Sequence, residues 1–480
     1  MQTECGVLCM ISKTNISSYD FISTLKKIQH RGQDACGISF YEKNKIRTVK
    51  DKGKIDEVFR QKMEVKKKIF LGHVRYTTSG SSNNNTNTQE DNKGIQPILV
   101  DDICSFVFNG NILTKEEINN LFNDRENVSL DTNKIIKFLR NYKHQELTAG
   151  EFFNVLENFY ITYNRAFNII FLFKHYVFII RDVYGTRPLY YINNSHTIII
   201  GSETVCSSDN FNQNIYRNVE PGEIISINTR NLTIQKKKVR TPSFKAHCLF
   251  ESLYFMNKRS INLDTNTPIY YYRIALGNNL AKQEIEYEAK FNLDISTMYS
   301  NNHEKIVIGI PESGYESGRG YADYRKYPFT NKAIIKTKQI RSFIGKTDAE
   351  RKSILSQKFI FNDIYIKDKV VFLVDDSIVR GHTMKYLVEK CFSLGAVEVH
   401  VRIASPPIRN VCPYGVDLKS KNEMIANKYR GNDGIQSYIG ATTLVYLSLE
   451  NMEDLFKLEH YCMGCINGNY NESCYSNLKW

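Results

Sequence analysis

The segment VVFLVDDSIVRGHT, residues 370–383, places two acids before a turn suited to phosphate. Asp375 and Asp376 end an apolar strand, where open α/β sheets bind ligands, and their carboxylates can accept hydrogen bonds from vicinal hydroxyls. Free N–H groups at a helix start, two hydroxyls and a guanidinium can hold a phosphate dianion. These side chains belong to Ser377, Thr383 and Arg380. A sugar phosphate satisfies both features, and the alternative is a flavodoxin-like strand end whose acids only cap the helix.

A second loop follows another apolar run, Ile306–Ile310. The side chains of Glu312 and Ser313, beside the flexible Gly314, could approach a metal ion bound to pyrophosphate. The sequence therefore predicts a Gly/Ser loop over Pro311–Gly318. Alone, this loop is a weak signal.

Cys5 lies close to the start of the chain, in the run CGVLCM. If residues 1–4 were removed, the α-amine of Cys5 would titrate near neutrality and could serve as the base that activates its own thiol. Taken alone, the better interpretation is a buried strand cysteine, because free Cys is among the most buried residue types.

Cys462 and Cys465 form a C-x-x-C pair that could be redox-active, zinc-binding or cluster-binding. A pair alone does not decide among these, since a four-thiolate site needs two more cysteines. The chain has eleven cysteines, and this odd number in a chain without a basic stretch before its first short apolar run argues against a disulfide framework.

Composition predicts a globular cytoplasmic protein. A length of 480 residues favours two domains, and 42% apolar with 24% charged residues is close to the globular average. The net charge of +13 is compatible with nucleic acid, a membrane surface or phosphorylated substrates. The longest basic runs, Lys66–Lys68 and Lys236–Lys238, are too short for a basic arm, so we expect no nucleic-acid partner. No apolar run is long enough to span a bilayer, and we expect no membrane partner.

Short apolar runs in the first half predict strands, and helical periodicity separates them. The predicted strands are Cys5–Ile11, Ile69–Val74, Ile103–Phe108, Ala166–Phe173, Tyr176–Arg181 and Thr197–Gly201. The predicted helices are Tyr19–Gln29, Lys115–Phe122, Thr132–Phe138 and Thr148–Phe159. This mixture favours stacked sheets flanked by helices.

After a polar, Lys-rich stretch at Thr233–Lys245, which we take as the domain boundary, strands and helices alternate. Further strands are predicted at Val370–Val374 and Val397–Ile403, with a helix between them. Gly395 stands at the stop position of that helix. This alternation predicts a parallel α/β sheet.

Four strings of the first half resemble class II glutamine amidotransferases in order and spacing: HRGQDACGI (His30–Ile38), GHVRYTTSG (Gly72–Gly80), FNGNI (Phe108–Ile112) and LDT (Leu130–Thr132). The resemblance implies that Cys5 attacks the glutamine amide, and that Asn109 and the backbone N–H of Gly110 form the oxyanion hole. It implies glutamine-binding roles for Arg75 on the carboxylate, Asp131 on the α-amine and Arg31 as the residue that orders the site. Singly, Arg75 could be a surface salt bridge and Asp131 a helix N-cap. An Asn-rich insertion lies at residues 81–95.

The segment 370–383 resembles the phosphoribosyl-pyrophosphate (PRPP) loop of type I phosphoribosyltransferases. That resemblance assigns Asp375 and Asp376 to the ribose hydroxyls and to Mg²⁺, and it assigns the 5′-phosphate to Ser377, Ile378, Val379, Arg380, Gly381 and Thr383. Glu312, Ser313 and Gly314 then match the pyrophosphate loop. Lys336 starts a lid pattern that continues through Lys338, Arg341 and Phe343 and is one residue short, and His382 stands where the family more often has Thr.

Glucosamine-phosphate synthase and asparagine synthetase share the first set of strings but lack a PRPP loop, so the combination resembles the amidophosphoribosyltransferases over nearly the whole chain. The iron-sulfur branch of that family has a short propeptide, matching Met1–Glu4, and four cluster-binding cysteines. These match Cys248, Cys412, Cys462 and Cys465 and imply a [4Fe-4S] cluster, with structural zinc as the alternative. We expect Cys9, Cys36, Cys104, Cys206, Cys391 and Cys474 to be core or incidental.

The resemblance implies an α/β protein. Residues 5–240 would form an α+β N-terminal-nucleophile hydrolase domain of stacked antiparallel sheets, and residues 241–480 a type I phosphoribosyltransferase domain with a parallel sheet and a C-terminal cluster-binding segment. The implied reaction converts glutamine, PRPP and water to 5-phosphoribosylamine, glutamate and pyrophosphate, the entry step of purine synthesis, with Mg²⁺.

The family also implies purine nucleotides as feedback inhibitors and a homo-oligomer, dimer or tetramer. Two other classes stay open at this stage. One is a PRPP-binding regulator that binds nucleic acid, and the other is a structural cluster protein.

Overall fold

A computed structural model gives the fold of the chain and describes residues 4–43, 45–60, 64–76, 94–112, 131–163, 166–207, 216–241, 244–291, 300, 302–337, 348–418, 420–453, 455–456 and 458–470. The predicted helix Lys115–Phe122, most of the Asn-rich insertion, the lid positions after Thr337 and Cys474 lie outside these residues. Within them, none of the helices is both long and apolar enough to cross a bilayer.

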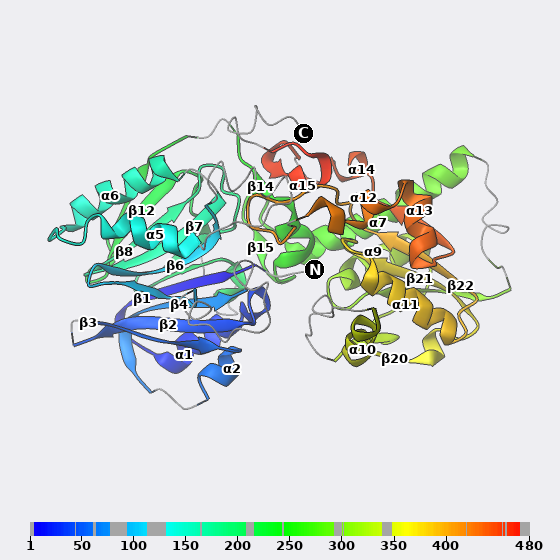
Figure 1. The fold of residues 1–480 in the computed structure, drawn as a ribbon, viewed down its shortest axis with the longest axis horizontal. Coiled ribbons are helices and arrows are strands. Elements are labelled where there is room, and N and C mark those ends of the chain that lie inside the picture. The colour runs from blue at the N-terminus through cyan, green and yellow to red at the C-terminus, as the bar shows by residue number, and fades with distance from the viewer. Residues whose placement is uncertain are drawn as a thin grey trace.

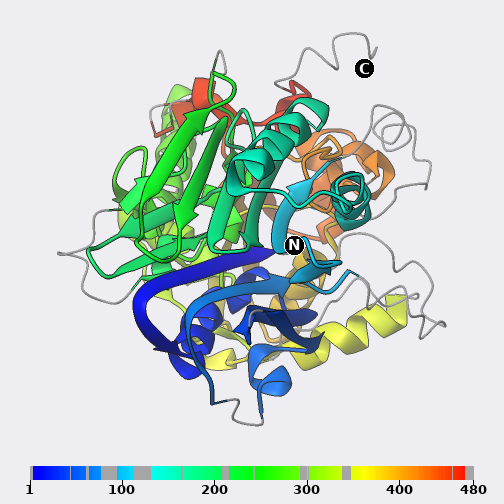
Figure 2. The ribbon, with the colours of Figure 1, turned by 90° about the vertical axis from the view of Figure 1, so that its left-hand side faces the viewer.

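The first half contains two stacked antiparallel sheets. The first has the order β11-β9-β10-β1-β4-β2-β3, and the second has the order β13-β12-β8-β7-β6-β5. The strands of the first are β1 (Gly6–Ser17), β2 (Ala35–Glu42), β3 (Lys45–Lys52), β4 (Lys66–Arg75), β9 (Tyr190–Asn193), β10 (Thr197–Gly201) and β11 (Tyr216–Asn218). Those of the second are β5 (Ile98–Val100), β6 (Cys104–Asn111), β7 (Ala166–Phe173), β8 (Tyr176–Arg181), β12 (Glu223–Asn228) and β13 (Ile234–Lys238). In Figure 2 the blue strands β1 to β4 lie below the cyan and green strands of the second sheet.

Strand β7 shows why the sheets stack. All eight of its residues are buried, and because side chains alternate along a strand, its two faces enter different cores. Ile170 and Leu172 face the core between the sheets. Phe167, Phe171 and Phe173 face the outer core under helices α5 (Asp131–Arg140) and α6 (Ala149–Thr162). Helices α1 (Ser18–Lys26) and α2 (Ile55–Val58) contribute to the core on the opposite side of the first sheet. The stacked-sheet prediction is therefore confirmed.

The second half is built on a parallel sheet with the order β18-β17-β21-β22-β23. Its strands are β17 (Glu304–Gly309), β18 (Phe329–Thr330), β21 (Lys369–Asp375), β22 (Glu398–Ile403) and β23 (Thr443–Tyr446). Helices α7 (Ile269–Lys290) and α9 (Gly314–Arg325) share a core with one face of the sheet. Helices α10 (Asp348–Lys358), α11 (His382–Ser393) and α13 (Gly431–Ile439) share a core with the other face. Figure 1 shows this half beside the stacked sheets, and the predicted parallel sheet is confirmed.

Short elements connect and cover the halves. They are β14 (His247–Cys248), the π-helix Glu251–Phe255, β15 (Ile261–Asn262), β16 (Thr267–Pro268), β19 (Ile334–Lys336), β20 (Phe359–Phe361), α12 (Ile425–Lys428), α14 (Glu450–Glu453), β24 (Tyr461–Cys462) and α15 (Gly464–Asn467). Strand β14 pairs in parallel with β24, so the C-terminal segment returns to the junction of the two halves.

Most predicted strands shift by a few residues at their ends, and one other prediction is wrong in part. The stretch Thr233–Lys245, which we took as the domain boundary, contains the edge strand β13, which pairs with β12. The loop predicted over Pro311–Gly318 stops at Ser313, because α9 begins at Gly314. The glycines of that segment are part of a helix, and they allow close packing.

Gly320 brings α9 against α7. A Cβ on Gly320 would lie 2.0 Å from the carbonyl oxygen of Ile274, and one on Gly277 would lie 1.9 Å from that of Ser317. Both contacts are with backbone atoms, which cannot rotate away. Only glycine at these two positions therefore permits this separation of the helices.

We expect Gly320→Ala to lower the free energy of unfolding by about 1–3 kcal/mol, because overpacking forces the backbones apart. Urea unfolding followed by circular dichroism measures the change. Gly150→Ala in α6 is the matched control, since a Cβ there meets nothing within 4 Å. Helix propensity alone predicts a gain of up to about 1 kcal/mol for the control. Equal effects of the two substitutions would contradict the packing argument.

Candidate active site

Cys5 stands immediately before β1, and the pairing of Gly6 with Val74 places it next to Arg75 at the end of β4. Its sulfur accepts a hydrogen bond from the N–H of Tyr76 at 3.4 Å and lies 3.5 Å from the carbonyl oxygen of Tyr76. Burial raises the pKa of the Cys5 thiol to about 11. With Glu4 still attached, the sulfur is therefore a protonated thiol at neutral pH.

Asn109 and Gly110 lie on β6, opposite Asn168 and Phe167 of β7. Asn109 is 1% exposed, and its side-chain nitrogen has no hydrogen-bond partner among the residues that the structure describes. A buried donor without a partner costs about 1–3 kcal/mol, so such groups are rare unless a ligand uses them. Gly110 has φ of 143°, and a Cβ there would lie 2.2 Å from the carbonyl oxygen of Ala166. This position therefore requires glycine.

Arg75 and Asp131 are both held by their surroundings. Arg75 is buried, and a Cβ on Gly94 would lie 2.7 Å from its guanidinium, so the loop at Gly94 passes directly over it. Asp131 is the first residue of α5, and its carboxylate accepts the N–H of Ile112 at 3.2 Å. Asp131 thus ties α5 to the end of the segment that carries Asn109.

Arg31 is fully buried, and its three nitrogens all form hydrogen bonds. Nε donates to the carbonyl oxygen of Cys5 at 3.0 Å. One terminal nitrogen donates to Glu203 at 2.7 Å, and the other donates to Glu251 at 2.7 Å. Burial alone would raise the pKa of Glu203, but His30 and Arg31 outweigh it and hold that pKa below its usual value. Arg31 therefore fixes the backbone of Cys5.

Arg187 extends this buried network toward the second half. Its guanidinium lies 3.6 Å from Glu251 and donates to the carbonyl oxygen of Tyr414 at 2.6 Å. The sequence analysis missed Glu203, Glu251 and Arg187. Each is a charged residue in a string of otherwise apolar or small residues. A charged residue in such a string is the feature by which the sequence could have indicated a buried ionic role.

Glu4 also reaches the network. It is 4% exposed, and its carboxyl oxygen lies 3.0 Å from Arg187 without forming an aligned hydrogen bond. Burial raises the pKa of Glu4 to about 8, although Arg187 acts in the opposite direction. The residue before Cys5 is thus a buried and largely protonated acid at neutral pH.

The predicted phosphate turn leads from β21 into α11. Burial and the adjacent Asp376 raise the pKa of Asp375 well above its ordinary value. The hydroxyl of Ser377 donates to the carboxylate of Asp376, and Gly381 with φ of 83° is the N-cap of α11. Arg380 donates to Glu423 at 2.8 Å. The first residues of α11 line the same cavity as the two acids.

The second predicted loop lies against the first. A Cβ on Gly314 would lie 2.5 Å from the carbonyl oxygen of Val374 and 3.0 Å from the Cα atom of Asp375. Strands β17 and β21 are parallel neighbours, so both loops leave the same edge of the sheet. The structure therefore brings together the two loops that the sequence analysis paired.

One cavity of about 990 Å³ extends from the two loops of the second half to Tyr76, beside Cys5, and the predicted glutaminase residues themselves are not part of its lining. From the second half it is lined by predicted residues of both loops and by Lys336: Glu312, Ser313, Asp375, Asp376, Ser377, Ile378, Val379, Arg380, Gly381 and Thr383. From the first half it is lined by His30, Asp34, Lys54 and Tyr76, the last of which contacts the Cys5 sulfur. Tyr254, Arg273 and Lys358 also line it, and the sequence analysis gave them no role.

Three segments bring four cysteines into one neighbourhood. Cys248 and Cys462 are paired residues of β14 and β24, and Cys465 follows in α15. Burial raises the pKa of Cys465 well above its usual value, and the thiols of Cys412, Cys248 and Cys462 raise it further. All four are free thiols. In the described ranges, however, no group of three or more His, Cys, Asp or Glu side chains is placed to hold a metal ion.

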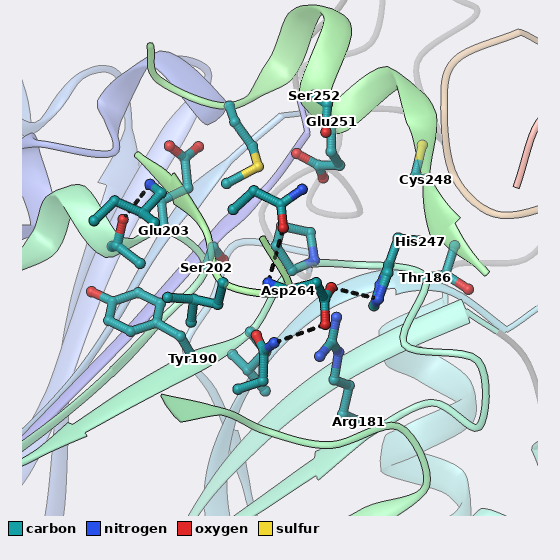
Figure 3. Close-up of a pocket in the computed structure, with 18 of the residues that line it drawn as sticks. Arg181, Thr186, Tyr190, Ser202, Glu203, His247, Cys248, Glu251, Ser252 and Asp264 are labelled. Carbon is teal, nitrogen blue, oxygen red and sulfur yellow. Dashed lines mark hydrogen bonds and ion pairs between the residues drawn. The ribbon is translucent and has the colours of Figure 1, made fainter. Parts of the chain in front are cut away.

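A smaller pocket of about 60 Å³ is lined by residues of both this neighbourhood and the Arg31 network. Figure 3 shows Cys248, Glu251 and Glu203 among its lining residues. His247, next to Cys248, lies 2.9 Å from Asp264 across the pocket. Of the remaining cysteines in the described part of the chain, Cys9, Cys36, Cys104, Cys206 and Cys391 are buried, as expected for core residues.

Comparisons with known proteins extend over nearly the whole chain. A family model described as a glutamine amidotransferase domain matches residues 83–207. Amidophosphoribosyltransferase of Pyrococcus horikoshii is 31% identical over 492 residues, which cover 98% of this chain and 97% of that protein. Amidophosphoribosyltransferase of Methanothermobacter thermautotrophicus is 29% identical over 482 residues, covering 98% and 95%.

A solved structure is similar over the same length. Glutamine PRPP amidotransferase from B. subtilis, complexed with ADP and GMP, matches with a TM-score of 0.77 at 26% identity and covers 98% of both chains.

Fold and sites together define a class of protein in which a glutamine amidotransferase half is joined to a phosphoribosyltransferase half. With 31% identity to a curated relative over nearly the full length, the chain belongs to the amidophosphoribosyltransferase family and is an enzyme. The family and the α/β fold class predicted from the sequence motifs are both confirmed.

Removing one acid from the network tests its importance for stability. We expect Glu251→Gln to lower the free energy of unfolding by about 3–5 kcal/mol, because it leaves two buried guanidinium groups short of negative charge. Denaturant unfolding followed by far-UV circular dichroism measures this loss of stability. The control is Glu42→Gln, which removes an exposed partner of Arg47 and should change little. A Glu251 variant as stable as this control would show that the network is not a structural link.

Proposed function

We propose that the chain hydrolyses glutamine at Cys5 and transfers the ammonia to PRPP, giving 5-phosphoribosylamine, glutamate and pyrophosphate, the first committed step of purine synthesis. The observation that carries this proposal is the cavity lined by both loops of the second half and by Tyr76, whose N–H donates to the Cys5 sulfur. Ammonia released beside Tyr76 can reach the loops at Asp375 inside this cavity. An internal route keeps the ammonia from bulk water, where it would become protonated ammonium.

In the proposed glutaminase half, removal of residues 1–4 frees the α-amine of Cys5 to take the proton from its thiol. The carbon–sulfur bond forms as the amide carbonyl becomes an oxyanion, which Asn109 and the N–H of Gly110 stabilise. The side-chain nitrogen of Asn109, which has no hydrogen-bond partner in the described part of the chain, supports this role. Arg75 binds the substrate carboxylate and Asp131 its α-amine, while Arg31 acts indirectly by holding the Cys5 backbone.

In the proposed transferase half, Asp375 and Asp376 bind the ribose hydroxyls and Mg²⁺. The turn from Ser377 to Thr383 binds the 5′-phosphate at the N-terminus of α11. The adjacent carboxyls of Asp375 and Asp376 fit a divalent cation, because an ion would offset both the desolvation by burial and the neighbouring carboxylate that raise the pKa of Asp375. Bound Mg²⁺ would supply charge neutralisation on the pyrophosphate. The pyrophosphate group is bound by Glu312, Ser313, Gly314 and Lys336 in this proposal.

Arg380 needs a change of partner in this proposal. It is bonded to Glu423 by two nitrogens, so binding of a phosphate dianion would compete with that carboxylate. Ser377, Thr383 and the backbone N–H groups of the turn are the more direct phosphate donors.

We also propose a [4Fe-4S] cluster held by Cys248, Cys412, Cys462 and Cys465. Four free thiols from three segments, close enough to raise the pKa of Cys465, support it. Arg187 opposes the effect of burial on the pKa of both Cys248 and Cys412, which favours thiolate ligands. Four thiolates suit this cluster, which would cross-link the C-terminal segment to the junction of the halves. Zinc in the same thiolates is the alternative.

Regulation and assembly follow by analogy. The B. subtilis relative was solved with ADP and GMP, and we propose that purine nucleotides inhibit this chain by feedback. We further propose a homo-oligomer, a dimer or tetramer.

Separate assays of the two half-reactions test the proposed function. Intact mass should show a chain that starts at Cys5. Cys5→Ser should abolish glutamine-dependent product formation but leave ammonia-dependent formation intact, because only the glutaminase needs the thiol. Asp376→Asn should lower both. A processed wild-type chain that makes no 5-phosphoribosylamine from either donor would refute the proposal.

Asn109→Ala tests the oxyanion donor. We expect glutaminase kcat to fall about 10²–10³-fold, as for loss of one such donor, with little change in KM. Ammonia-dependent turnover is the internal control and should stay at the wild-type rate. A loss confined to KM would assign Asn109 to glutamine binding.

Metal analysis of anaerobically purified protein tests the cluster. We expect about four irons and four sulfides per chain, as for a cubane held by four thiolates. Cys462→Ser should lower the iron content, while Cys391→Ala, a buried cysteine of a different core, should not. About one zinc per chain without iron would favour the structural zinc site instead.

A further inference from the structure

Asn168 lies beside the proposed oxyanion donor Asn109, although no sequence motif points to it. The two are directly paired residues of β7 and β6. Paired residues of an antiparallel ladder have side chains on the same face of the sheet, with Cβ atoms about 5 Å apart. Ile170 and Leu172, which alternate in phase with Asn168 along β7, face the core between the sheets. Asn168 therefore lies between the sheets, next to the group that would bind the substrate carbonyl.

The carboxamide of Asn168 is fully buried and only half satisfied. Its nitrogen donates to the carbonyl oxygen of Pro188 at 2.9 Å. A carbonyl can only accept, so this contact identifies the nitrogen and leaves the amide oxygen facing away from Pro188. Among the residues that the structure describes, that oxygen has no hydrogen-bond partner, and neither has the side-chain nitrogen of Asn109. A buried acceptor and a buried donor thus lie on neighbouring positions without bonding to each other, a state that is rare unless a ligand uses both.

The carbonyl that holds Asn168 belongs to a fixed loop. Arg181, labelled in Figure 3, is the neighbour of Asn168 on β8. Its guanidinium donates to the carbonyl oxygens of Gly185 and Arg187 at 2.8 and 2.9 Å. Pro188 follows directly, so its carbonyl has little freedom to move. The orientation of the Asn168 amide is therefore set before any ligand binds.

The same loop and the same core lie beside the proposed nucleophile. The guanidinium of Arg187 lies 3.0 Å from the carboxyl of Glu4, the residue before Cys5. Val7, two residues after Cys5, packs in the core that also contains Ile170. The acceptor of Asn168 is thus at the end of the stacked sheets where Cys5 stands.

We propose that the side-chain oxygen of Asn168 accepts a hydrogen bond from the amide nitrogen of glutamine, an inference that rests on the proposed function. A primary carboxamide presents a carbonyl oxygen and an NH₂ group on one carbon, which matches the donor of Asn109 beside the acceptor of Asn168. Glutamate presents a second oxygen instead of NH₂, and that oxygen would face another acceptor with no proton between them. The pair therefore selects a carboxamide over a carboxylate.

The role of Asn168 in the hydrolysis is to orient the leaving group. The Cys5 sulfur forms a bond to the amide carbon, and the thiol proton moves to the α-amine of Cys5. That proton then passes to the amide nitrogen, the carbon–nitrogen bond breaks with its electron pair on nitrogen, and ammonia leaves. Asn168 takes up no proton in these steps, but it fixes the rotation of the NH₂ group about the bond that breaks.

Two substrates that differ only in the leaving group test this role. Glutamate γ-methyl ester keeps the carbonyl group that Asn109 would bind but has no N–H to donate. Release of glutamate from each substrate, with PRPP present, gives kcat/KM for the attack by Cys5. We expect Asn168→Ala to lower kcat/KM for glutamine about tenfold or more, the effect of losing one buried hydrogen bond. The value for the ester should stay unchanged.

The ester also separates this role from a contact with the enzyme itself. The α-amine of Cys5 is the other N–H donor near this acceptor, and losing a contact with it would lower kcat/KM equally for both substrates. Equal losses would therefore overturn the inference, as would an unchanged value for glutamine.

Controls complete the design. Asn193→Ala is the matched control, because Asn193 is an exposed asparagine at the end of β9 and should change neither value. Ammonia-dependent turnover shows that each variant is folded. Where Asn168→Ala fails that check, the smaller change Asn168→Ser replaces it, with the same selective loss expected. If the processed wild-type chain releases glutamate from neither substrate, it is the proposed function that fails, and this inference with it.

Discussion

The buried network of Arg31, Glu203, Glu251 and Arg187 is the interaction on which the rest of the arrangement depends. Arg31 holds the carbonyl of Cys5, and Glu251 begins the short helix that carries Tyr254 into the shared cavity. Cys5, the proposed nucleophile, and Tyr254, which lines the cavity, are thus both held by the same network of four charged side chains. Buried ion pairs add little net stability, because desolvation offsets their attraction. What this network supplies is one defined position of the two halves relative to each other.

A fixed junction matters because the second half presents its chemistry at a single edge. Parallel pairing of β17 with β21 sends both loops out at the carboxyl ends of the strands, where ligands bind in open α/β sheets. That edge faces the cavity that also contains Tyr76, the residue hydrogen-bonded to the Cys5 sulfur. If the junction rotated, the loops would keep their phosphate-binding geometry but would lose their connection to the source of ammonia. The network therefore sets the position of the two halves relative to each other, and the sheet edge sets where the two loops lie in the second half.

The sequence predicted whatever depends on local pattern or on contiguous motifs. The alternation of β7 and the acids that end β21 are examples, since strand period and loop composition are visible in the residues themselves. It did not reveal contacts between distant segments. Glu203 and Glu251 meet Arg31 across 172 and 220 residues, and no local rule relates them. The helical start at Gly314 was missed because glycine disfavours helices on average, whereas here Gly314 packs against β21, and Gly320 of the same helix packs against α7.

The charge balance of the network bears on the proposed removal of residues 1–4. Arg31 and Arg187 carry two positive charges, and Glu203 and Glu251 carry two negative charges, so the network is balanced without Glu4. Since burial raises the pKa of Glu4 to about 8, its carboxyl is mostly neutral at physiological pH. An ionised Glu4 would instead give the buried network an excess negative charge before cleavage, at a cost of several kcal/mol. A protonated Glu4 leaves the balance unchanged, so the network that positions Cys5 can persist from the uncleaved to the cleaved chain.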